Sequence, residues 1–97
     1  MPENYFVYIL TNKPNGILYV GMTNNIARRI IEHKQNLYEG FSKKYGLNKL
    51  VYYEVYNDPE SAIVAEKRMK KWNRAWKVRR ILTTNPNWDD LIEDLNK

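Results

Sequence analysis

A strand–turn–strand pattern near the start of the chain does most to limit its possible folds. Residues 5–10 (YFVYIL) and 17–21 (ILYVG) are rich in β-branched and aromatic side chains, which is typical of strands. Between them lies NKPNG at 12–16, and its Asn-Gly step suits a turn with positive φ. The sequence therefore predicts an antiparallel β-hairpin.

Helix and strand patterns follow in turn. Residues 23–25 supply an N-cap candidate for a helix over about 26–36. LVYYEVY at 50–56 predicts a third strand. Asp58 before Pro59 is a strong helix start. That helix is expected to reach about Trp72 and to continue to Leu82, with a bend near Asn73 left open. Asn87 is the candidate cap of a short last helix.

The order β-β-α-β-α-α predicts an α/β fold of the α+β type, with a small three-stranded, mainly antiparallel sheet flanked by helices. We expect one domain over residues 1–97. Its core should span about 5–82, and the short C-terminal helix 87–95.

Composition excludes several functional classes. The 97 residues include no cysteine, which rules out disulfides, a thiolate zinc site and a Cys nucleophile. The single histidine, His33, excludes a metal site with two His ligands. The longest apolar run, residues 5–10, is far too short to span a membrane. No secretion signal is visible, so we expect a cytoplasmic protein without membrane contact.

Charge is concentrated in one segment. The chain has 16 Lys+Arg against 11 Asp+Glu, a net charge of +5. Residues 67–80 hold eight basic side chains and no acidic one. This is either a solvated helix face or a polyanion-binding surface, and we favour the second. Trp72 and Trp76 lie inside the run, four residues apart, and we interpret them as core anchors rather than base-stacking platforms.

Two tyrosines are the first candidates for chemistry. If residues 13–16 form a four-residue loop, Tyr19 lies opposite Leu10, and Tyr8 and Tyr19 become diagonal neighbours about 7–8 Å apart. A two-residue loop puts them on one face but further apart, and a three-residue loop separates them. Gly21 lacks a Cβ, which could allow close approach of a phosphate backbone.

Three further residues complete the candidate set. Arg29 and His33 are spaced i,i+4 on the first helix, so they share one face. Glu66 is the only acid between Ser61 and Lys77, and a lone carboxylate suits a hard cation such as Mg²⁺. Each residue also has an ordinary structural explanation; Glu66, for example, could pair with Lys70. Composition and spacing alone predict a small basic domain that binds nucleic acid.

The same residues resemble the GIY-YIG nuclease superfamily. Phe6-Val7-Tyr8 stands where the family has Gly-Ile-Tyr, and Tyr19-Val20-Gly21 stands for Tyr-Ile-Gly. Arg29 follows Tyr19 by ten residues, and His33 follows four later. GFSKKY at 40–45 and KWNRAWK at 71–77 resemble the small stand-alone bacterial members. The resemblance spans about residues 5–82, and the family fold agrees with the order above.

The resemblance implies a role for each catalytic candidate. Glu66 would hold one Mg²⁺ or Mn²⁺ ion against the scissile phosphate, and Arg29 would stabilise the charge developing on phosphorus. Tyr8 and Tyr19 would position and deprotonate the attacking water, with the choice of base left open. His33 would hydrogen-bond a tyrosine or a phosphate.

The resemblance also implies a nucleic-acid-binding surface. Met22 follows Gly21 where some relatives have a lysine, which leaves Lys43 or Lys44 as substitutes. The candidate binding residues are glycine or basic throughout: Gly21, Arg28, Lys34, Lys43, Lys44, Lys70, Arg74 and Lys77.

The sequence thus predicts a Mg²⁺-dependent DNA endonuclease or nickase that recognises shape rather than sequence, with a role in DNA repair or recombination. Branched or damaged DNA is the expected substrate, although the residues do not distinguish DNA from RNA. A protein partner could supply specificity. The alternative is a weak or inactive nucleic-acid-binding module with the same fold. A third reading is an adaptor that binds a protein through Trp72 and Trp76.

Overall fold

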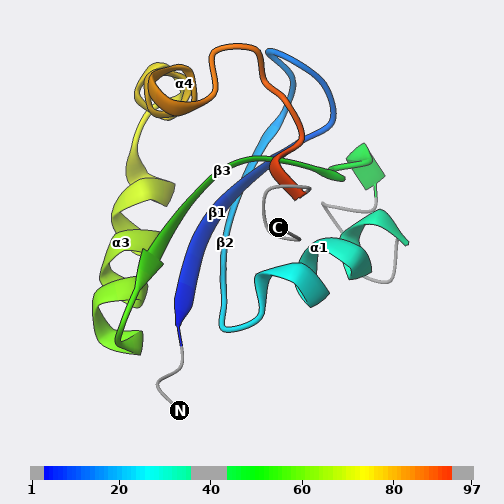
Figure 1. Cartoon of the computed structure of the whole chain (residues 1–97). Helices are drawn as coiled ribbons and strands as arrows, with labels where there is room; N and C mark the ends of the chain where they lie inside the picture. Colours follow the sequence, from blue (N-terminus) through cyan, green and yellow to red (C-terminus); the bar gives the residue numbers. More distant parts are fainter. Residues whose placement is uncertain (1–3, 36–43, 93–97) are drawn as a thin grey trace.

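The fold is built on one three-stranded antiparallel sheet. The computed structural model describes residues 4–35 and 44–92. Its strands are β1 (Tyr5–Thr11), β2 (Leu18–Thr23) and β3 (Lys49–Tyr56), in the spatial order β2-β1-β3 (Figure 1). β1 is therefore central, and β2 and β3 are edge strands among those described. This confirms the predicted sheet.

The hairpin has the register of the four-residue loop. Tyr19 lies opposite Leu10, and Gly21 lies opposite Tyr8. The N–H of Gly16 donates to the carbonyl of Lys13 at 2.9 Å, which closes the turn. This register puts Tyr8 and Tyr19 on the same face of the sheet, because side chains alternate along each strand.

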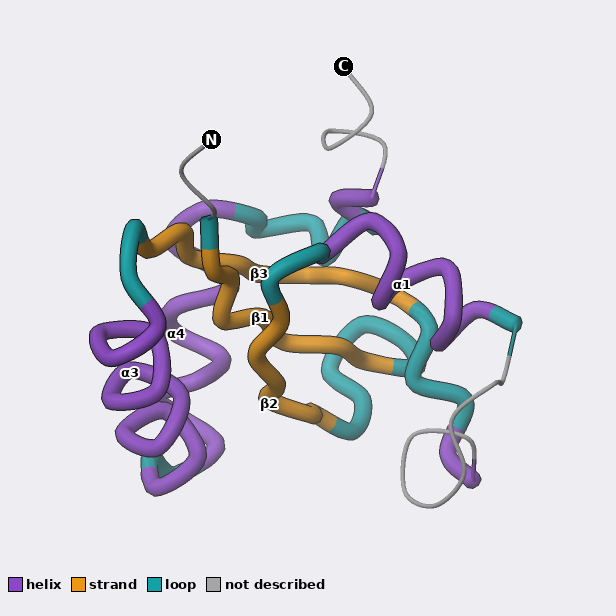
Figure 2. The backbone as a smooth tube through the Cα atoms, turned by 90° about the horizontal axis from the view of Figure 1, so that it is seen from below, coloured by secondary structure: helices purple, strands orange, loops and turns teal. Residues whose placement is uncertain are grey.

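Helices cover both faces of the sheet. The helix α1 (Ile26–Lys34) lies on one side, and α3 (Pro59–Lys71) and α4 (Arg74–Thr84) lie on the other. Figure 2 shows the same separation from below. The order β-β-α-β-α-α is therefore confirmed. No helix in the described ranges is long and apolar enough to cross a membrane.

Alternation along β1 divides the core into two clusters. Val7 and Ile9 pack on the side of α3 and α4, while Tyr8 and Leu10 pack on the side of α1. The first cluster also contains Val20, Val51, Tyr52, Ala62, Met69, Ile81 and Trp88. The second contains Ile26, Ile30, Leu47 and Leu50. A central strand buried on both faces explains the continuous apolar run in β1.

The long helix expected after β3 is two helices. α3 ends at Lys71, and Trp72 adopts an extended backbone with ψ 145°. Asn73 then starts α4, because its side chain accepts a hydrogen bond from the N–H of Trp76 at 3.0 Å. Asparagine at this position favours a cap over a helix interior. The chain therefore changes direction at Asn73, the position of the bend considered in the sequence.

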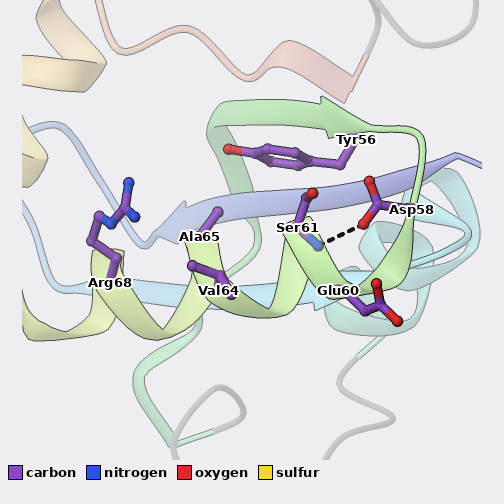
Figure 3. Close-up of a pocket in the computed structure, with 7 residues that line it drawn as sticks. All are labelled: Tyr56, Asp58, Glu60, Ser61, Val64, Ala65 and Arg68. Atoms are coloured by element: carbon purple, nitrogen blue, oxygen red, sulfur yellow. Dashed lines mark hydrogen bonds between the residues drawn. The ribbon is translucent and has the colours of Figure 1, made fainter.

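The start of α3 is as expected. The Asp58 carboxylate accepts a hydrogen bond from the N–H of Ser61 at 2.7 Å, and Pro59 occupies the first turn. Hydrogen bonds from Ser61 lower the pKa of Asp58. Figure 3 shows this cap, with the ring of Tyr56 on β3 lying above the same side of the helix.

The segment after α4 differs from the expected short helix. Trp88 has a φ of 56°, which lies in the left-handed region, so no helix begins there. Asn85 holds this segment instead: its amide nitrogen donates to the carbonyls of Val51 and Asp89 at 3.2 and 2.8 Å. Leu91 and Ile92 form a short turn. The first helix ends at Lys34, with Gln35 as its C-cap. Residue 36 of the expected first helix and residues 93–95 of the expected last helix lie outside the described residues.

Candidate active site

Tyr8, Tyr19 and His33 come together on the α1 side of the sheet. The imidazole of His33 contacts both phenols, with ring centroids 6.3 Å from Tyr8 and 5.9 Å from Tyr19. The hairpin register supplies the tyrosines, and the last turn of α1 supplies the histidine. Three groups that can exchange protons therefore share one cluster.

Tyr8 and Gly21 form one packing unit within this cluster. Tyr8 is only 1% exposed, and its phenol lies over the backbone of Gly21. A Cβ at position 21 would lie 2.5 Å from Tyr8 Oη and 2.6 Å from its Cζ, closer than van der Waals contact allows. Gly21 thus makes room for a buried phenol; its expected contact with a phosphate backbone stays a prediction.

α1 positions Arg29 and His33 from the same side. Asn25 caps the helix by accepting from the N–H of Arg28 at 3.1 Å, and Ile26 and Ile30 anchor it to the sheet. Arg29 is partly exposed, whereas His33 is 4% exposed. Their i,i+4 spacing places both on one face of the helix.

The electrostatics keep His33 neutral. Burial lowers its pKa, the charge of Arg29 lowers it further, and Glu32 opposes this less strongly. A neutral imidazole has one ring nitrogen that donates and one that accepts. At neutral pH His33 is therefore able to accept a proton in this cluster.

Glu66 lies in the other layer, on α3. Its carboxylate is 22% exposed and lies 3.4 Å from the Lys70 ammonium nitrogen, so the ordinary pairing with Lys70 is present. Glu66 nevertheless belongs to the sheet-facing side of α3, because it is four residues from Ala62 and three from Met69, both fully buried.

The phase of α3 shows which strand Glu66 approaches. Ser61, Ala65 and Arg68 lie on the flank toward Tyr56 of β3, as Figure 3 shows. Glu66 and Lys70 are on the opposite flank, because successive helix residues are about 100° apart. α3 packs mainly against β2 and β1, so this second flank faces β2.

The edge of β2 is thus common to both halves of the candidate site. β2 is the outer strand of the sheet beside β1, and it carries Tyr19 on its α1 face. Val20 packs on the opposite face, with α3. A phosphodiester lying along this edge would have the phenol and imidazole on one side and the flank with Glu66 on the other.

The donor set fits one hard cation. The described ranges contain no group of three or more His, Asp or Glu side chains that could hold a metal. A half-buried carboxylate such as Glu66 suits Mg²⁺, which is usually bound by one or two carboxylates and completes its shell with water and phosphate oxygens. Mg²⁺ here would need substrate oxygens as well as Glu66.

A second tyrosine pair, on β3, is structural. The Tyr52 and Tyr56 hydroxyls both donate to the Glu54 carboxylate, at 2.6 and 2.9 Å. Burial raises the pKa of both phenols, and their hydrogen bonds to Glu54 raise it further. These tyrosines stay protonated and are not candidates for a base.

The basic candidates on α3 and α4 lie along the β2 side. Lys70 is beside Glu66. The Arg74 guanidinium donates to the carbonyl of Asn15, in the hairpin loop, at 2.8 Å. Arg74 and Lys77 together line a hollow with Ile17 and Leu18, next to Tyr19 in the chain. Three of the eight binding candidates therefore follow the edge that carries Tyr19.

The other basic candidates have individual surroundings. Arg28 pairs with Glu32 at 3.5 Å. The Lys34 ammonium donates to Asp90 at 2.6 Å and to the carbonyl of Asn48 at 2.8 Å. Lys44 lies over the ring of Tyr45, 5.4 Å from its centroid. Lys43 lies outside the described residues.

Two features escaped the sequence interpretation. Asp90 accepts from the N–H groups of Leu50 and Ile92, both at 3.2 Å, and so ties the C-terminal segment to β3; the sequence shows it only as part of an acidic stretch. Trp76 is 54% exposed, so its interpretation as a core anchor is wrong. Trp72, in contrast, does pack against the core. The phase of α4 carries the missing signal, because Val78 and Ile81 define the buried face.

Comparison with known proteins shows the family of this chain. Residues 4–79 match the GIY-YIG catalytic domain, and the chain belongs to the GIY-YIG family, whose domain is a nuclease domain. Within it, the relatives are small stand-alone bacterial UPF0213 proteins. A UPF0213 protein of Clostridium perfringens is 31% identical over 91 residues, covering 94% of this chain and 97% of the relative. One of Syntrophus aciditrophicus is 34% identical over 87 residues, covering 89% and 97%.

A solved structure has the same fold. The solution NMR structure of the UPF0213 protein BH0048 from Bacillus halodurans superposes with a TM-score of 0.56 at 25% identity, covering 90% of this chain and 92% of that one. The fold expected from the sequence and the resemblance to small stand-alone bacterial members of the family are therefore confirmed.

Proposed function

We propose that the protein is a Mg²⁺-dependent DNA endonuclease or nickase that hydrolyses phosphodiester bonds at the β2 edge. The observation that supports this most is the cluster of Tyr8, Tyr19 and neutral His33 beside Arg29. A pure binding protein has no evident need for a buried neutral histidine in contact with two phenols.

The two tyrosines are proposed to have different tasks. Tyr8 is buried over Gly21, so its task is to position His33 and Tyr19 rather than to contact the substrate. Tyr19 is partly exposed and lies on the edge strand, so it faces the substrate and the attacking water. As the water oxygen bonds to phosphorus, its proton passes through the Tyr19 hydroxyl to His33. The bond from phosphorus to the leaving nucleotide oxygen breaks, and that oxygen takes a proton from solvent.

Charge on the reacting phosphate is balanced from both sides of the edge. Arg29 supplies a guanidinium, whose planar fork matches phosphate oxygens. A divalent cation bound through Glu66 would supply Lewis-acid stabilisation of the phosphate. Lys70, Arg74 and Lys77 would hold neighbouring phosphates.

The same contacts support selection by shape. Lys and Arg contacts to phosphate fix the position of DNA without reading its sequence. Branched or damaged DNA, a role in repair or recombination, and a protein partner that adds specificity are parts of this proposal. Because phosphate contacts do not distinguish DNA from RNA, the corresponding RNA is the substrate against which DNA cleavage is compared.

A second candidate function is nucleic-acid binding without efficient cleavage. One observation favours it: Glu66 is paired with Lys70 and lies in the opposite layer from the tyrosines. If Glu66 does not hold the ion, the basic edge still binds DNA.

Substitution of Glu66 decides between the two. Wild type, Glu66→Gln and the control Glu60→Gln, on the same helix, are incubated with supercoiled plasmid and branched DNA, with Mg²⁺ or EDTA. We expect Glu66→Gln to lower the cleavage rate at least about 10²-fold, as loss of one group that stabilises transition-state charge does, and to leave DNA binding intact. Glu60→Gln should cleave like wild type. A wild-type protein that binds but never cuts would establish the binding module.

A further inference from the structure

An exposed tryptophan stands out on α4, away from the β2 edge. Trp76 is 54% exposed, and its ring meets that of Trp72 edge to face, with centroids 6.1 Å apart and planes at 68°. The two rings line a hollow of about 280 Å³ together with Arg79 and Arg80. This hollow, the Trp groove, belongs to neither half of the candidate active site.

The Trp groove is preformed. Trp72 packs against the core, and the Arg80 guanidinium lies 5.4 Å from its ring centroid. Trp76 is in the first turn of α4, where its backbone N–H is bound by the Asn73 cap. The Trp76 ring is held against the packed Trp72 ring by their edge-to-face contact, which reduces the conformational entropy that has to be lost when a ligand binds.

The surrounding charge selects the occupant. The segment 67–80 has eight basic residues and no acidic one, and two of its arginines form the wall of the groove. A ligand should therefore be anionic and should also offer a flat aromatic face. A second copy of this chain would bring the same positive face against this one, which costs energy.

Among polyanions, these two requirements are met by single-stranded nucleic acid. Its unpaired bases can stack on an indole, and its phosphates can pair with guanidinium groups. A duplex keeps its bases stacked inside and offers phosphates alone. The exposed face of Trp76 can therefore stack with a base only in the single-stranded form.

We propose that the Trp groove is a second nucleic-acid-binding site, in which an unpaired base stacks on Trp76 while Arg79 and Arg80 contact its phosphates. The inference rests on the proposed function to the extent that the bound strand is part of the substrate. The expected substrate is then a nucleic acid with a single-stranded segment beside the bond to be cut.

The site lies apart from the edge that would carry the chemistry. Trp72 follows Arg68 by four residues, so it continues the flank of α3 that faces β3, whereas Glu66 and Lys70 are on the flank that faces β2. A substrate that occupies both sites has to pass around α3 and α4. A flexible single strand can do so, and a stiff duplex cannot.

Binding in EDTA tests the proposal without any cleavage. Fluorescently labelled oligo-dT and a hairpin duplex of equal phosphate number are titrated with wild type, Trp76→Ala, Trp76→Phe and the control Leu82→Ala, which removes another exposed apolar side chain from α4. We expect Trp76→Ala to weaken oligo-dT binding about 5- to 150-fold, the range for loss of one base–aromatic stack. Duplex binding should stay within about 2-fold, Trp76→Phe should retain most of the affinity, and Leu82→Ala should bind like wild type.

Three results would overturn the proposal. Equal, small effects of Trp76→Ala and Leu82→Ala on oligo-dT would show that no base stacks on Trp76. Parallel losses for oligo-dT and duplex would show that the groove does not distinguish unpaired bases. A wild-type dimer in sedimentation without DNA that Trp76→Ala dissociates would show a protein interface.

The two proposals fail separately. If wild type binds oligo-dT through Trp76 but cuts nothing in Mg²⁺, the nuclease proposal fails and the groove stands. If wild type cuts DNA and Trp76→Ala binds oligo-dT as tightly as wild type does, the groove fails and the nuclease stands.

Discussion

Gly21→Ala is the most direct test of the packing beneath the candidate site. The added Cβ would lie 2.5 Å from Tyr8 Oη and 2.6 Å from Cζ, and Tyr8 is fully buried. Overpacking a core costs about 1–3 kcal/mol. Replacing Gly inside a strand otherwise gains about 0.5–1 kcal/mol. We therefore expect Gly21→Ala to lower the free energy of unfolding by about 0–2.5 kcal/mol, with a central value near 1 kcal/mol.

The sign of the effect should depend on Tyr8. In a Tyr8→Leu background the shorter side chain no longer reaches position 21, so Gly21→Ala should be neutral or stabilising by about 0.5–1 kcal/mol. A double-mutant cycle should then give a coupling free energy of about 1–3 kcal/mol. Urea unfolding followed by circular dichroism measures all four proteins, with unchanged m-values showing that only stability has changed.

The contact between the Tyr8 phenol and Gly21 can be refuted by the same measurements. If Gly21→Ala changes the unfolding free energy equally with Tyr8 and with Leu at position 8, the phenol does not lie over Gly21. A Gly21→Ala protein more stable than wild type would contradict it as well.

Lowering the pH through about 6.5 should destabilise the fold. The pKa of His33 is lowered in the folded protein, so the unfolded chain takes up the proton first, and full stability lies above this pH. The urea midpoints of wild type should fall with pH, and those of His33→Gln should change less. Asp90→Ala should cost about 1–3 kcal/mol of unfolding free energy, since two backbone N–H groups lose their acceptor. Asp89→Ala should cost under about 0.5 kcal/mol, because its recorded hydrogen bonds come from the backbone, and equal costs would refute this assignment. EDTA should stop cleavage without shifting the thermal midpoint, because a single carboxylate does not hold a structural ion; a large shift would contradict the role given to Glu66.

The parts of the fold that follow from local rules could be predicted from the sequence. Strand alternation and the length of the turn determine the hairpin register, so residues 5–21 reduce the placement of Tyr8 and Tyr19 to a few alternatives, and the structure selects the register of the four-residue loop. The caps at Asn25 and Asp58 are equally local. Arg29 and His33 share a face because four residues make about one helical turn.

The parts that depend on distant partners could not be predicted. Asn85 bonds to the carbonyl of Val51, 34 residues away, and this contact directs the chain after α4. Trp88 is buried with a positive φ, which no local pattern indicates. The layer in which Glu66 lies depends on how α3 packs against the sheet. The sequence could therefore single out Glu66 as the lone acid of a basic segment, but it could not give the position of Glu66 relative to the tyrosines.

The two motifs that characterise the family are in direct contact in the sheet. The tyrosine of the first motif, Tyr8, lies opposite the glycine of the second, Gly21. Only a residue without a Cβ leaves room for the phenol. A chain that keeps this buried tyrosine should therefore keep glycine opposite it, whatever else changes in the two strands.

The position of Tyr19 on an outer strand also bears on which bonds within a polymer can be reached. A closed pocket accepts the end of a chain and stops it, whereas the rim of a sheet has no stop at either side. Among the strands described, β2 has a neighbour only on the β1 side. A long strand of DNA can lie along such a rim at any point of its length, which suits cutting in the middle of a polymer rather than trimming from its terminus.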